Sequence, residues 1–294
     1  MAYSEISMAR GDASQLPVVH VWTPDAGARG VLVIAHGMGE HGLRYARFAE
    51  SANGAGFVVY AIDHRGHGRT VRSEDQLGDF GPDGWAGLLD DLTALVERVS
   101  KEHAGLDVLL LGHSMGSFLA QHFLTESSGA IAAAALSGTT AADLITAPPE
   151  DPEADLFMAM NAAFAPTRTD FDWLSRDPQE VDRYVADPLC GFTVADASLA
   201  SMGADALAFS QQDATARVRN DLPIYVFSGD RDPVGANGEG VELVATRYRE
   251  AGVEDVVLRL YPDARHELLN ETNRDEVTDD FLAWAGRFLR ASGE

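Results

Sequence analysis

The stretch DVLLLGHSMGSFLAQHFLT, residues 107–125, decides the fold. It starts with an apolar run typical of a buried β-strand, turns at two glycines that flank Ser114, and continues with a helical pattern from Phe118 to Thr125. The pattern G-H-S-M-G at residues 112–116 puts a serine on a tight turn between strand and helix, with its hydroxyl exposed at the sheet edge. The stretch therefore predicts a strand-turn-helix unit of an α/β protein and makes Ser114 a candidate nucleophile.

Outside this stretch, strand-length apolar runs alternate with amphipathic stretches, which indicates a mostly parallel central sheet flanked by helices. The clearest helix spans about residues 82–103, where six apolar residues from Trp85 to Val99 share one face. A similar pattern from Val277 to Phe288 predicts a last helix packed against the sheet. The strands are expected at Val31–Ala35, Phe57–Ile62, Asp107–Leu111, Ile131–Leu136, Ile224–Phe227 and Val256–Leu260.

Residues 141–220 interrupt this alternation. They contain no strand-like run, but they have an acidic, proline-rich stretch at Ala147–Glu153 and a short helical pattern at Leu156–Phe164. Eighty residues are too many for a connecting loop. We therefore expect an α/β core made of residues 1–140 and 221–294, with a helical cap of residues 141–220 over the sheet edge where such folds bind ligands.

Charge and composition narrow the possible partners. The 294 residues are 46% hydrophobic and 23% charged, as in soluble globular proteins. Acidic residues outnumber basic ones by 46 to 22, for a net charge of −24, and Lys101 is the only lysine. Nucleic acids and anionic lipid headgroups need a basic surface, so neither is an expected partner. The acid excess reflects either adaptation to salt or an ordinary solvated surface. Cys190 is the only cysteine, which excludes an intrachain disulfide.

No segment of the chain predicts membrane insertion. The N-terminal residues are polar and broken by Gly11 and Pro17, and the longest apolar runs fall far short of the roughly 20 residues of a membrane helix. We expect a cytoplasmic protein that touches a membrane surface at most weakly, through its cap.

The candidate nucleophile needs a base to remove its proton and an acid to orient that base. Two aspartates, Asp230 and Asp232, follow the strand at 224–227, and His266 follows the last strand. The order serine, aspartate, histidine, each after a strand, is that of the α/β-hydrolase fold. We expect a catalytic triad of Ser114, Asp232 and His266. Asp232 is preferred because it lies further from the strand, whereas Asp230 suits the turn itself.

Acyl transfer also requires N–H donors for a developing oxyanion. The Met115 N–H at the serine turn is one expected donor. The glycine-rich loop at residues 36–41 supplies the other, and Met38 N–H is the candidate there. The alternative for this loop is a plain flexible connection. His64 and His67 form no recognisable metal motif, so no metal site is expected.

Five motifs resemble the monoglyceride lipase and lysophospholipase branch of the α/β-hydrolases, which is serine aminopeptidase S33-like. Residues 36–45 resemble its H-G-x-x-E-H-x-x-R-Y, residues 63–68 its D-x-R-G-H-G, and residues 112–116 its G-H-S-M-G. Its acid segment G-x-x-D-x-V and base segment R-H-E-x-x-N-E match residues 229–234 and 265–271. The resemblance covers about residues 17 to 291. It departs at Thr70, where the branch often has serine, and within the cap, where Asp187–Leu189 alone is similar.

The resemblance implies hydrolysis of carboxylic esters through an acyl-enzyme, without a cofactor, on a small substrate with an acyl chain. Gly37 and His113 are expected to border the substrate. Apolar cap residues are expected to line the acyl pocket, the alternative being that they form the core of the cap: Leu156, Phe157, Met158, Met160 and Phe164.

Other activities fit the same three residues. An aminopeptidase, a thioesterase or a carbon–carbon bond hydrolase differs mainly in its cap. An aminopeptidase needs an anionic subsite, which the acidic cap residues from Glu150 to Asp155 could provide. A binding protein without catalysis is disfavoured because serine, acid, base and glycine loop are all present.

Overall fold

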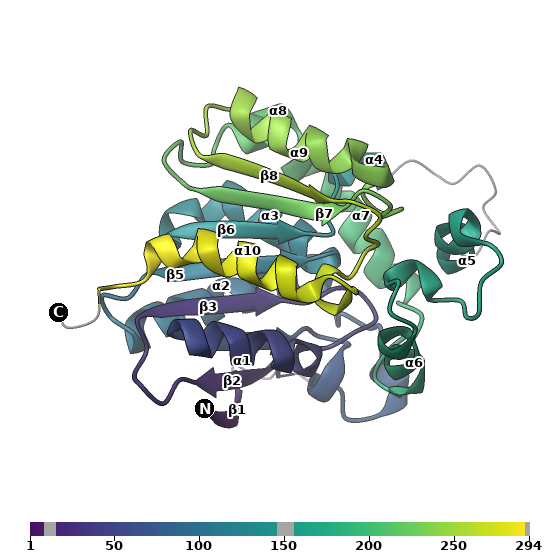
Figure 1. The fold of residues 1–294 in the computed structure, drawn as a ribbon, viewed down its shortest axis with the longest axis horizontal. Coiled ribbons are helices and arrows are strands. Elements are labelled where there is room, and N and C mark those ends of the chain that lie inside the picture. The colour runs from purple at the N-terminus through teal and green to yellow at the C-terminus, as the bar shows by residue number, and fades with distance from the viewer. Residues whose placement is uncertain (9–15, 146–155, 292–294) are drawn as a thin grey trace.

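The computed structural model describes residues 1–8, 16–145 and 156–291, and it contains one eight-stranded sheet in the order β1-β2-β4-β3-β5-β6-β7-β8 (Figure 1). Strands β3 to β8 run parallel, whereas β2 pairs antiparallel with β4, and β1 pairs antiparallel with β2. This mostly parallel sheet confirms the predicted fold class. The strand bounds are β1 Ala2–Ser7, β2 Val18–Thr23, β3 Gly30–Ala35, β4 Phe57–Asp63, β5 Val108–His113, β6 Ala133–Ser137, β7 Ile224–Gly229 and β8 Val256–Tyr261.

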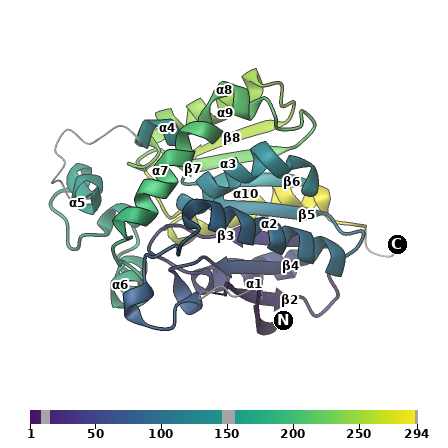
Figure 2. The same cartoon turned by 180° about the vertical axis from the view of Figure 1, so that it is seen from behind.

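Helices cover both faces of the sheet. On one face lie α1 (Ala46–Ala55) and α10 (Arg274–Ala285), and on the other lie α2 (Gly84–Glu102), α3 (Met115–Ser127) and α9 (Glu239–Glu250) (Figures 1 and 2). Each layer of helices forms its own apolar core with the sheet. All residues of β3, β4, β5 and β7 are consequently buried, because both faces of these strands are covered.

The six strands expected from the sequence are β3 to β8, each placed within two residues of its expected ends. The sequence analysis did not include β1 and β2. Strand β1 lies at the sheet edge with mostly exposed residues, so its sequence lacks an apolar run. Strand β2 is buried but contains His20, whose Nε2–H donates to the buried Asp63 at 3.0 Å. The buried polar residue interrupts the apolar run, so the sequence pattern did not indicate this strand.

Between β6 and β7, the described residues form helices and loops but no strand, and the parts of this segment pack differently. Ala206 and Phe209 of α7 belong to the main apolar core, whereas Trp173, Leu174 and Tyr184 form a separate small cluster. The proposed cap boundaries at residues 141 and 220 stay a prediction. The helix bounds here are α4 Ala142–Ile145, α5 Leu156–Asn161, α6 Pro178–Ala186, α7 Asp196–Ser210 and α8 Gln212–Thr215.

Helices α5 and α6 lie beyond the arrowheads of the parallel strands, at the carboxyl edge of the sheet (Figure 1). Helix α6 begins where Asp177 accepts a hydrogen bond from the Gln179 N–H at 3.0 Å and Pro178 occupies the first position. The acidic stretch at 147–153 lies outside the described residues, so its expected role stays a prediction.

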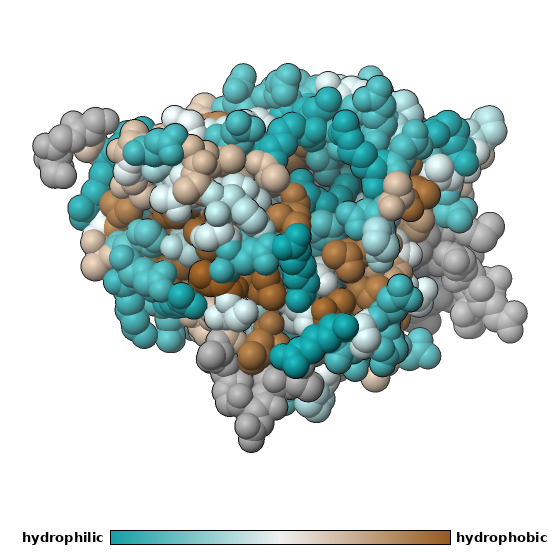
Figure 3. All heavy atoms as spheres, turned by 90° about the horizontal axis from the view of Figure 1, so that it is seen from below, coloured by the Kyte–Doolittle hydropathy of each residue, from teal (hydrophilic) through white to brown (hydrophobic). Residues whose placement is uncertain are grey.

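Polar and apolar side chains share the surface. Hydrophilic residues cover much of the face shown in Figure 3, with hydrophobic residues gathered between them. Within the described parts of the chain, none of the helices has both the length and the apolar character that crossing a bilayer requires.

Candidate active site

Ser114 occupies a strained turn between β5 and α3. Its φ of 51° and ψ of −122° lie in a region that residues with side chains rarely adopt. The two flanking glycines allow this turn, because a methyl group at Gly112 would lie 2.3 Å from the Gly116 oxygen and one at Gly116 would lie 2.1 Å from the Ala35 oxygen. The glycines of the G-x-S-x-G pattern are thus required by close backbone contacts.

His266 and Asp232 form a buried pair at the ends of β8 and β7. Because a carboxylate only accepts, Nδ1 of His266 carries the proton, and it donates to Oδ1 at 3.0 Å and Oδ2 at 2.9 Å. Asp232 also accepts from the Ser228 hydroxyl at 2.7 Å and from the Val234 N–H at 2.9 Å. Asp230 instead accepts from the Asp263 N–H at 2.7 Å, in the turn after β8.

The electrostatics of this pair favour the charged imidazolium. Burial alone lowers the pKa of His266, but the negative charge and hydrogen bonds of Asp232 outweigh it and raise that pKa above its ordinary value. Burial alone raises the pKa of Asp232, and His266 with the other donors outweighs it and holds that pKa below its usual range. Asp232 is thereby ionised, with its oxygens aimed at Nδ1.

Two aromatic rings hold the His266 imidazole. The ring of His113 lies 4.8 Å from it and the ring of Trp173 lies 4.9 Å from it, centroid to centroid. Burial, and then repulsion by His266, lower the pKa of His113 to about 4, so His113 is neutral near pH 7. Because His113 is neutral, it does not compete with His266 for the negative charge of Asp232.

The loop after β3 presents backbone N–H groups to the same place. Gly37 is fixed from two sides, because its N–H donates to Glu40 Oε1 at 2.6 Å and its oxygen accepts from His36 Nδ1 at 2.7 Å. Among the described residues, neither the Met38 N–H nor the Met115 N–H has a hydrogen-bond acceptor. The two expected oxyanion donors are therefore amides without an acceptor in the protein, one on the loop after β3 and one at the start of α3, and both residues line the same cavity.

The next residue of the loop, Gly39, is also fixed. Its N–H donates to His67 Nε2 at 3.3 Å, and its oxygen accepts from the Tyr184 hydroxyl of α6 at 2.8 Å. Burial lowers the pKa of His67 to about 4 and that of His64 to about 3, so both rings are neutral. Thr70, where the similar branch often has serine, also has a hydroxyl, and this hydroxyl donates to the backbone oxygen of Asp63 at 2.8 Å.

A cavity of about 310 Å³ joins these groups. Of the residues expected in the site, it brings together the nucleophile candidate, the base candidate, both oxyanion candidates, Gly37, His113 and Met160, while Asp232 lies behind His266. The lining residues are Gly37, Met38, Glu40, His113, Ser114, Met115, Phe118, Met160, Trp173, Leu174, Tyr184, Leu199, Met202, Gly203, Ala206, Val234, His266 and Glu267.

One expected pocket residue is placed differently, and three others are not tested. Phe164 packs against the Trp173 cluster, with the Arg265 guanidinium 4.2 Å from its ring, and it is not among the described lining residues. The backbones of Leu156 and Phe157 belong to α5, but their side chains, like that of Met158, lie outside the described part. The apolar wall comes instead from α7, at Leu199, Met202, Gly203 and Ala206.

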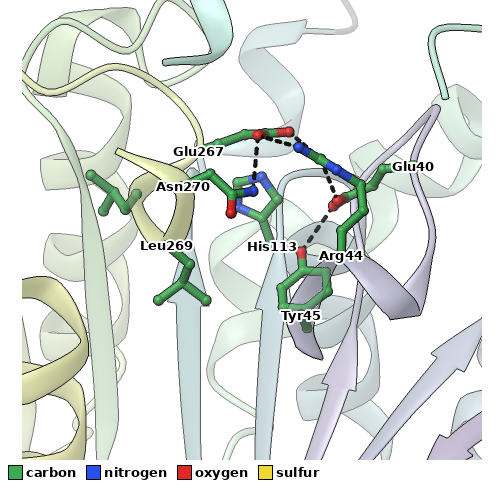
Figure 4. A pocket seen from close by; sticks show the side chains of 8 residues that line it. Glu40, Arg44, Tyr45, His113, Glu267, Leu269 and Asn270 are labelled. Carbon is green, nitrogen blue, oxygen red and sulfur yellow. Dashed lines mark hydrogen bonds and ion pairs between the residues drawn. The ribbon is translucent and has the colours of Figure 1, made fainter. Parts of the chain in front are cut away.

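A buried charge network under the cavity was missed by the sequence reasoning. Arg44 binds Glu40 Oε2 at 2.8 Å and binds both carboxylate oxygens of Glu267, at 2.7 Å to Oε2. The Tyr45 hydroxyl donates to Glu40 at 2.9 Å, and the Asn270 amide donates to Glu267 at 3.1 Å. Figure 4 shows Arg44 between the two carboxylates. The motifs at 36–45 and 265–271 contained these residues, but nothing local in either motif shows that they meet.

Taken together, the sheet order and the strand-turn-helix serine are those of an α/β-hydrolase. The chain matches the family described as serine aminopeptidase, S33, over residues 26–273, and it belongs to this family.

Named relatives are lipases and esterases. The chain is 33% identical over 272 residues to a monoacylglycerol lipase of Mycolicibacterium smegmatis, covering 91% of each chain. It is 28% identical over 267 residues to the monoglyceride lipase of Homo sapiens, covering 88% of this chain and 81% of the human one. A thermostable carboxyl esterase from Bacillus coagulans, in complex with glycerol, has a similar structure, with a TM-score of 0.87, 29% identity and coverage of 98% and 99%. The protein is thus an α/β-hydrolase similar to carboxylic ester hydrolases.

Proposed function

We propose that the protein hydrolyses carboxylic esters that carry an acyl chain, monoacylglycerols among them, through an acyl-enzyme on Ser114. The observation that carries the proposal is one cavity whose wall holds the Ser114 turn, the His266 imidazole backed by Asp232, and two unoccupied amides. The names of the relatives support the same substrate class.

In the proposed reaction, Ser114 Oγ attacks the ester carbonyl while His266 Nε2 takes the hydroxyl proton. Asp232 stabilises the resulting imidazolium, and the Met38 and Met115 N–H groups bind the oxyanion. His266 then gives the proton to the leaving alcohol. Water, activated by the same imidazole, attacks the acyl-enzyme and releases the carboxylic acid, which regenerates the Ser114 hydroxyl.

The acyl chain is placed along the apolar wall formed by α7 and Met160. A cavity of about 310 Å³ is at the small end of the range for ligand sites. Leu199 and Met202 offer apolar contacts without competing polar atoms, so burial of methylene groups contributes roughly 0.8 kcal/mol each.

The charge network argues against the aminopeptidase alternative. Among the residues that the structure describes, Glu40 and Glu267 are the carboxylates on the cavity wall, and an aminopeptidase would use such groups to bind the free amine. Both already bind Arg44, so neither offers an unpaired charge to a substrate amine. An ester that ends in a neutral alcohol fits this wall better.

The test is a panel of p-nitrophenyl esters from C2 to C16 together with monoacylglycerols. Ser114→Ala is expected to lower kcat by roughly 10⁴ to 10⁶ without unfolding the protein. Ser51→Ala, on the exposed face of α1, is the matched control and keeps full activity. Near-normal turnover by the Ser114 variant, or no turnover of any ester by the unmodified protein, overturns the proposal. Activity confined to C2 to C6 narrows it to short-chain esters.

A further inference from the structure

His41, Asp187 and Cys190 lie together at one edge of the cavity loop. His41 lies in the loop of Met38, three residues after it, and Asp187 follows the end of α6, three residues before Cys190. His41 Nε2–H donates to Asp187 Oδ2 at 3.0 Å, and the imidazole nitrogen, the carboxylate oxygen and the thiol sulfur all lie within 4.8 Å of one another. Among the described residues, no other three histidine, cysteine, aspartate or glutamate side chains are gathered this way.

We propose that these three side chains form a binding site for a transition-metal ion of the Zn²⁺ type. Imidazole nitrogen, thiolate sulfur and carboxylate oxygen are the protein ligands of zinc, and three of them leave a fourth tetrahedral position for water. The sequence analysis expected no metal site, because it considered His64 and His67, which are neighbours in the sequence. The three residues proposed here meet only in the folded chain.

The geometry requires little movement. Ligands that each lie about 2.0 to 2.3 Å from a tetrahedral zinc ion are roughly 3.5 Å apart, so the widest pair has to close by no more than about 1.3 Å. A hydrogen-bonded His–carboxylate pair is already in contact, with a proton where the ion would lie. The Leu189 N–H donates to Asp187 Oδ1 at 2.9 Å, which orients the carboxylate and leaves Oδ2 toward His41.

The surroundings suit a cation that arrives from solvent. The Asp187 side chain is 33% exposed, which opens a path to the site, while the His41 side chain is 7% exposed. Arg44 is the positive group that faces Cys190, and its charge is bound by two carboxylates, those of Glu40 and Glu267. With Asp187 included, the fixed charge around the site is negative.

Binding releases one proton. Burial is the main cause that raises the pKa of the Cys190 thiol, so the thiol is protonated in the absence of metal. Burial also acts to raise the pKa of Asp187, but His41 and the Leu189 N–H hold that pKa below its usual range, so the carboxylate is already ionised. Zn²⁺ displaces the thiol proton to form the Zn–S bond, and the Nε2 proton of His41 moves to Nδ1 when Nε2 binds the ion. One H⁺ therefore leaves for each ion bound.

The ion would join two parts of the protein that flank the cavity. Gly191, next to Cys190, already donates its N–H to the Gly39 oxygen at 2.9 Å, and Gly39 follows the oxyanion candidate Met38. An ion bound by His41, Asp187 and Cys190 would replace the His41–Asp187 hydrogen bond with metal bonds and bring Cys190 into the connection between the same two segments. The proposal does not rest on the proposed function, because binding is measured without turnover.

The first experiment titrates metal-free, full-length protein with Zn²⁺ by calorimetry in two buffers of different ionisation enthalpy. We expect one ion per chain and about one proton released, since one thiol ionises. Cys190→Ser and His41→Gln are each expected to weaken binding at least about tenfold. His103→Gln is the matched control and binds as the unmodified protein does, because His103 follows α2, contacts the Tyr60 hydroxyl and is not one of the three proposed ligands.

Two readouts separate this site from adsorption of cations by the acidic surface. Co²⁺ is expected to give a thiolate charge-transfer band that is absent from Cys190→Ser. Because Cys190 is the only thiol, its labelling rate with Ellman's reagent reports on it directly, and Zn²⁺ but not Mg²⁺ is expected to slow it. This labelling test needs no variant, so it holds even where a substitution impairs folding. Equal binding by all variants, unchanged labelling, or slowing by Mg²⁺ as well overturns the proposal.

Discussion

Replacing Arg44 by methionine is expected to unbalance the charge network under the cavity. In the protein, one guanidinium is shared by Glu40 and Glu267, and the exposed side-chain fractions are 10%, 4% and 6%. Methionine keeps the apolar length of the side chain but leaves two carboxylates buried without their cation. We therefore expect a loss that comes mostly from unpaired charge and only slightly from packing.

The expected loss follows from burial. Removing one partner of a buried ion pair costs about 3–5 kcal/mol, because the remaining charge is left uncompensated. Burial alone raises the pKa of Glu40, and Arg44 is the largest of the causes that hold it below its ordinary value of 4.5. Without Arg44 that pKa rises, so the folded variant binds more protons than its unfolded chain at pH above 4.5. The free energy of unfolding of Arg44→Met is thus expected to fall as pH rises from 5 to 8.

Urea denaturation at pH 5, 6.5 and 8 measures both effects. The matched control is Arg168→Met, whose partner is Asp182. This pair is 51% and 59% exposed, and exposed pairs contribute about 0–1 kcal/mol. The triple variant Arg44→Met with Glu40→Gln and Glu267→Gln is expected to lose the pH dependence. The reasoning is refuted if Arg44→Met costs no more than the control, or if its stability does not depend on pH.

Three further predictions concern catalysis. Asp232→Asn is expected to lower kcat by roughly 10⁴, whereas Asp230→Asn is expected to keep most activity, because the Asp230 carboxylate bonds only within the turn after β8. If ester assays show the reverse order, the acid of the triad is Asp230. The pKa of His266 is raised and the base must be neutral, so kcat/KM is expected to fall as pH drops through that raised pKa. Asp232→Asn is expected to shift this acidic limb of the pH–rate profile to lower pH. An unshifted acidic limb contradicts the pairing of His266 with Asp232. Gly203 lines the cavity and has open space where a side chain would point. Gly203→Leu is therefore expected to reduce kcat/KM for long-chain esters at least about tenfold, while C2 and C4 esters react as before. An equal loss for all chain lengths counts against the proposed position of the acyl chain.

Local patterns were enough to predict the part of the fold that positions the candidate site. Strands β3 to β7 are buried on both faces, so their sequences are apolar runs, whereas the edge strand β8 is only partly buried. The loops after these strands contain Met38, Ser114, Asp232 and His266. Contacts distant in sequence could not be predicted this way. Glu267 and Arg44 are 223 residues apart in the sequence, and a local hydrophobic pattern does not indicate that two such distant residues are in contact.

Local sequence patterns also could not predict which residues form the cavity wall. Helix α7 has apolar residues on all sides, because one side packs on the core at Phe209 and another faces the cavity at Leu199 and Met202. Phe164 shows the opposite case, since its position in an apolar stretch suggested the cavity, but Arg265 covers its ring in the neighbouring cluster. An apolar pattern indicates burial without indicating which surface does the burying.

The close contact of Gly116 with Ala35 has a consequence for how this protein can change over generations. Backbone atoms alone set the spacing there, since even a methyl group at Gly116 would lie 2.1 Å from the Ala35 oxygen. The turn of Ser114 and the loop of Met38 therefore keep their separation whatever side chains surround them. Substitutions in α7 can change the shape of the cavity wall for new substrates without changing that separation. Substrate selectivity can therefore evolve while the geometry of the reacting groups stays the same.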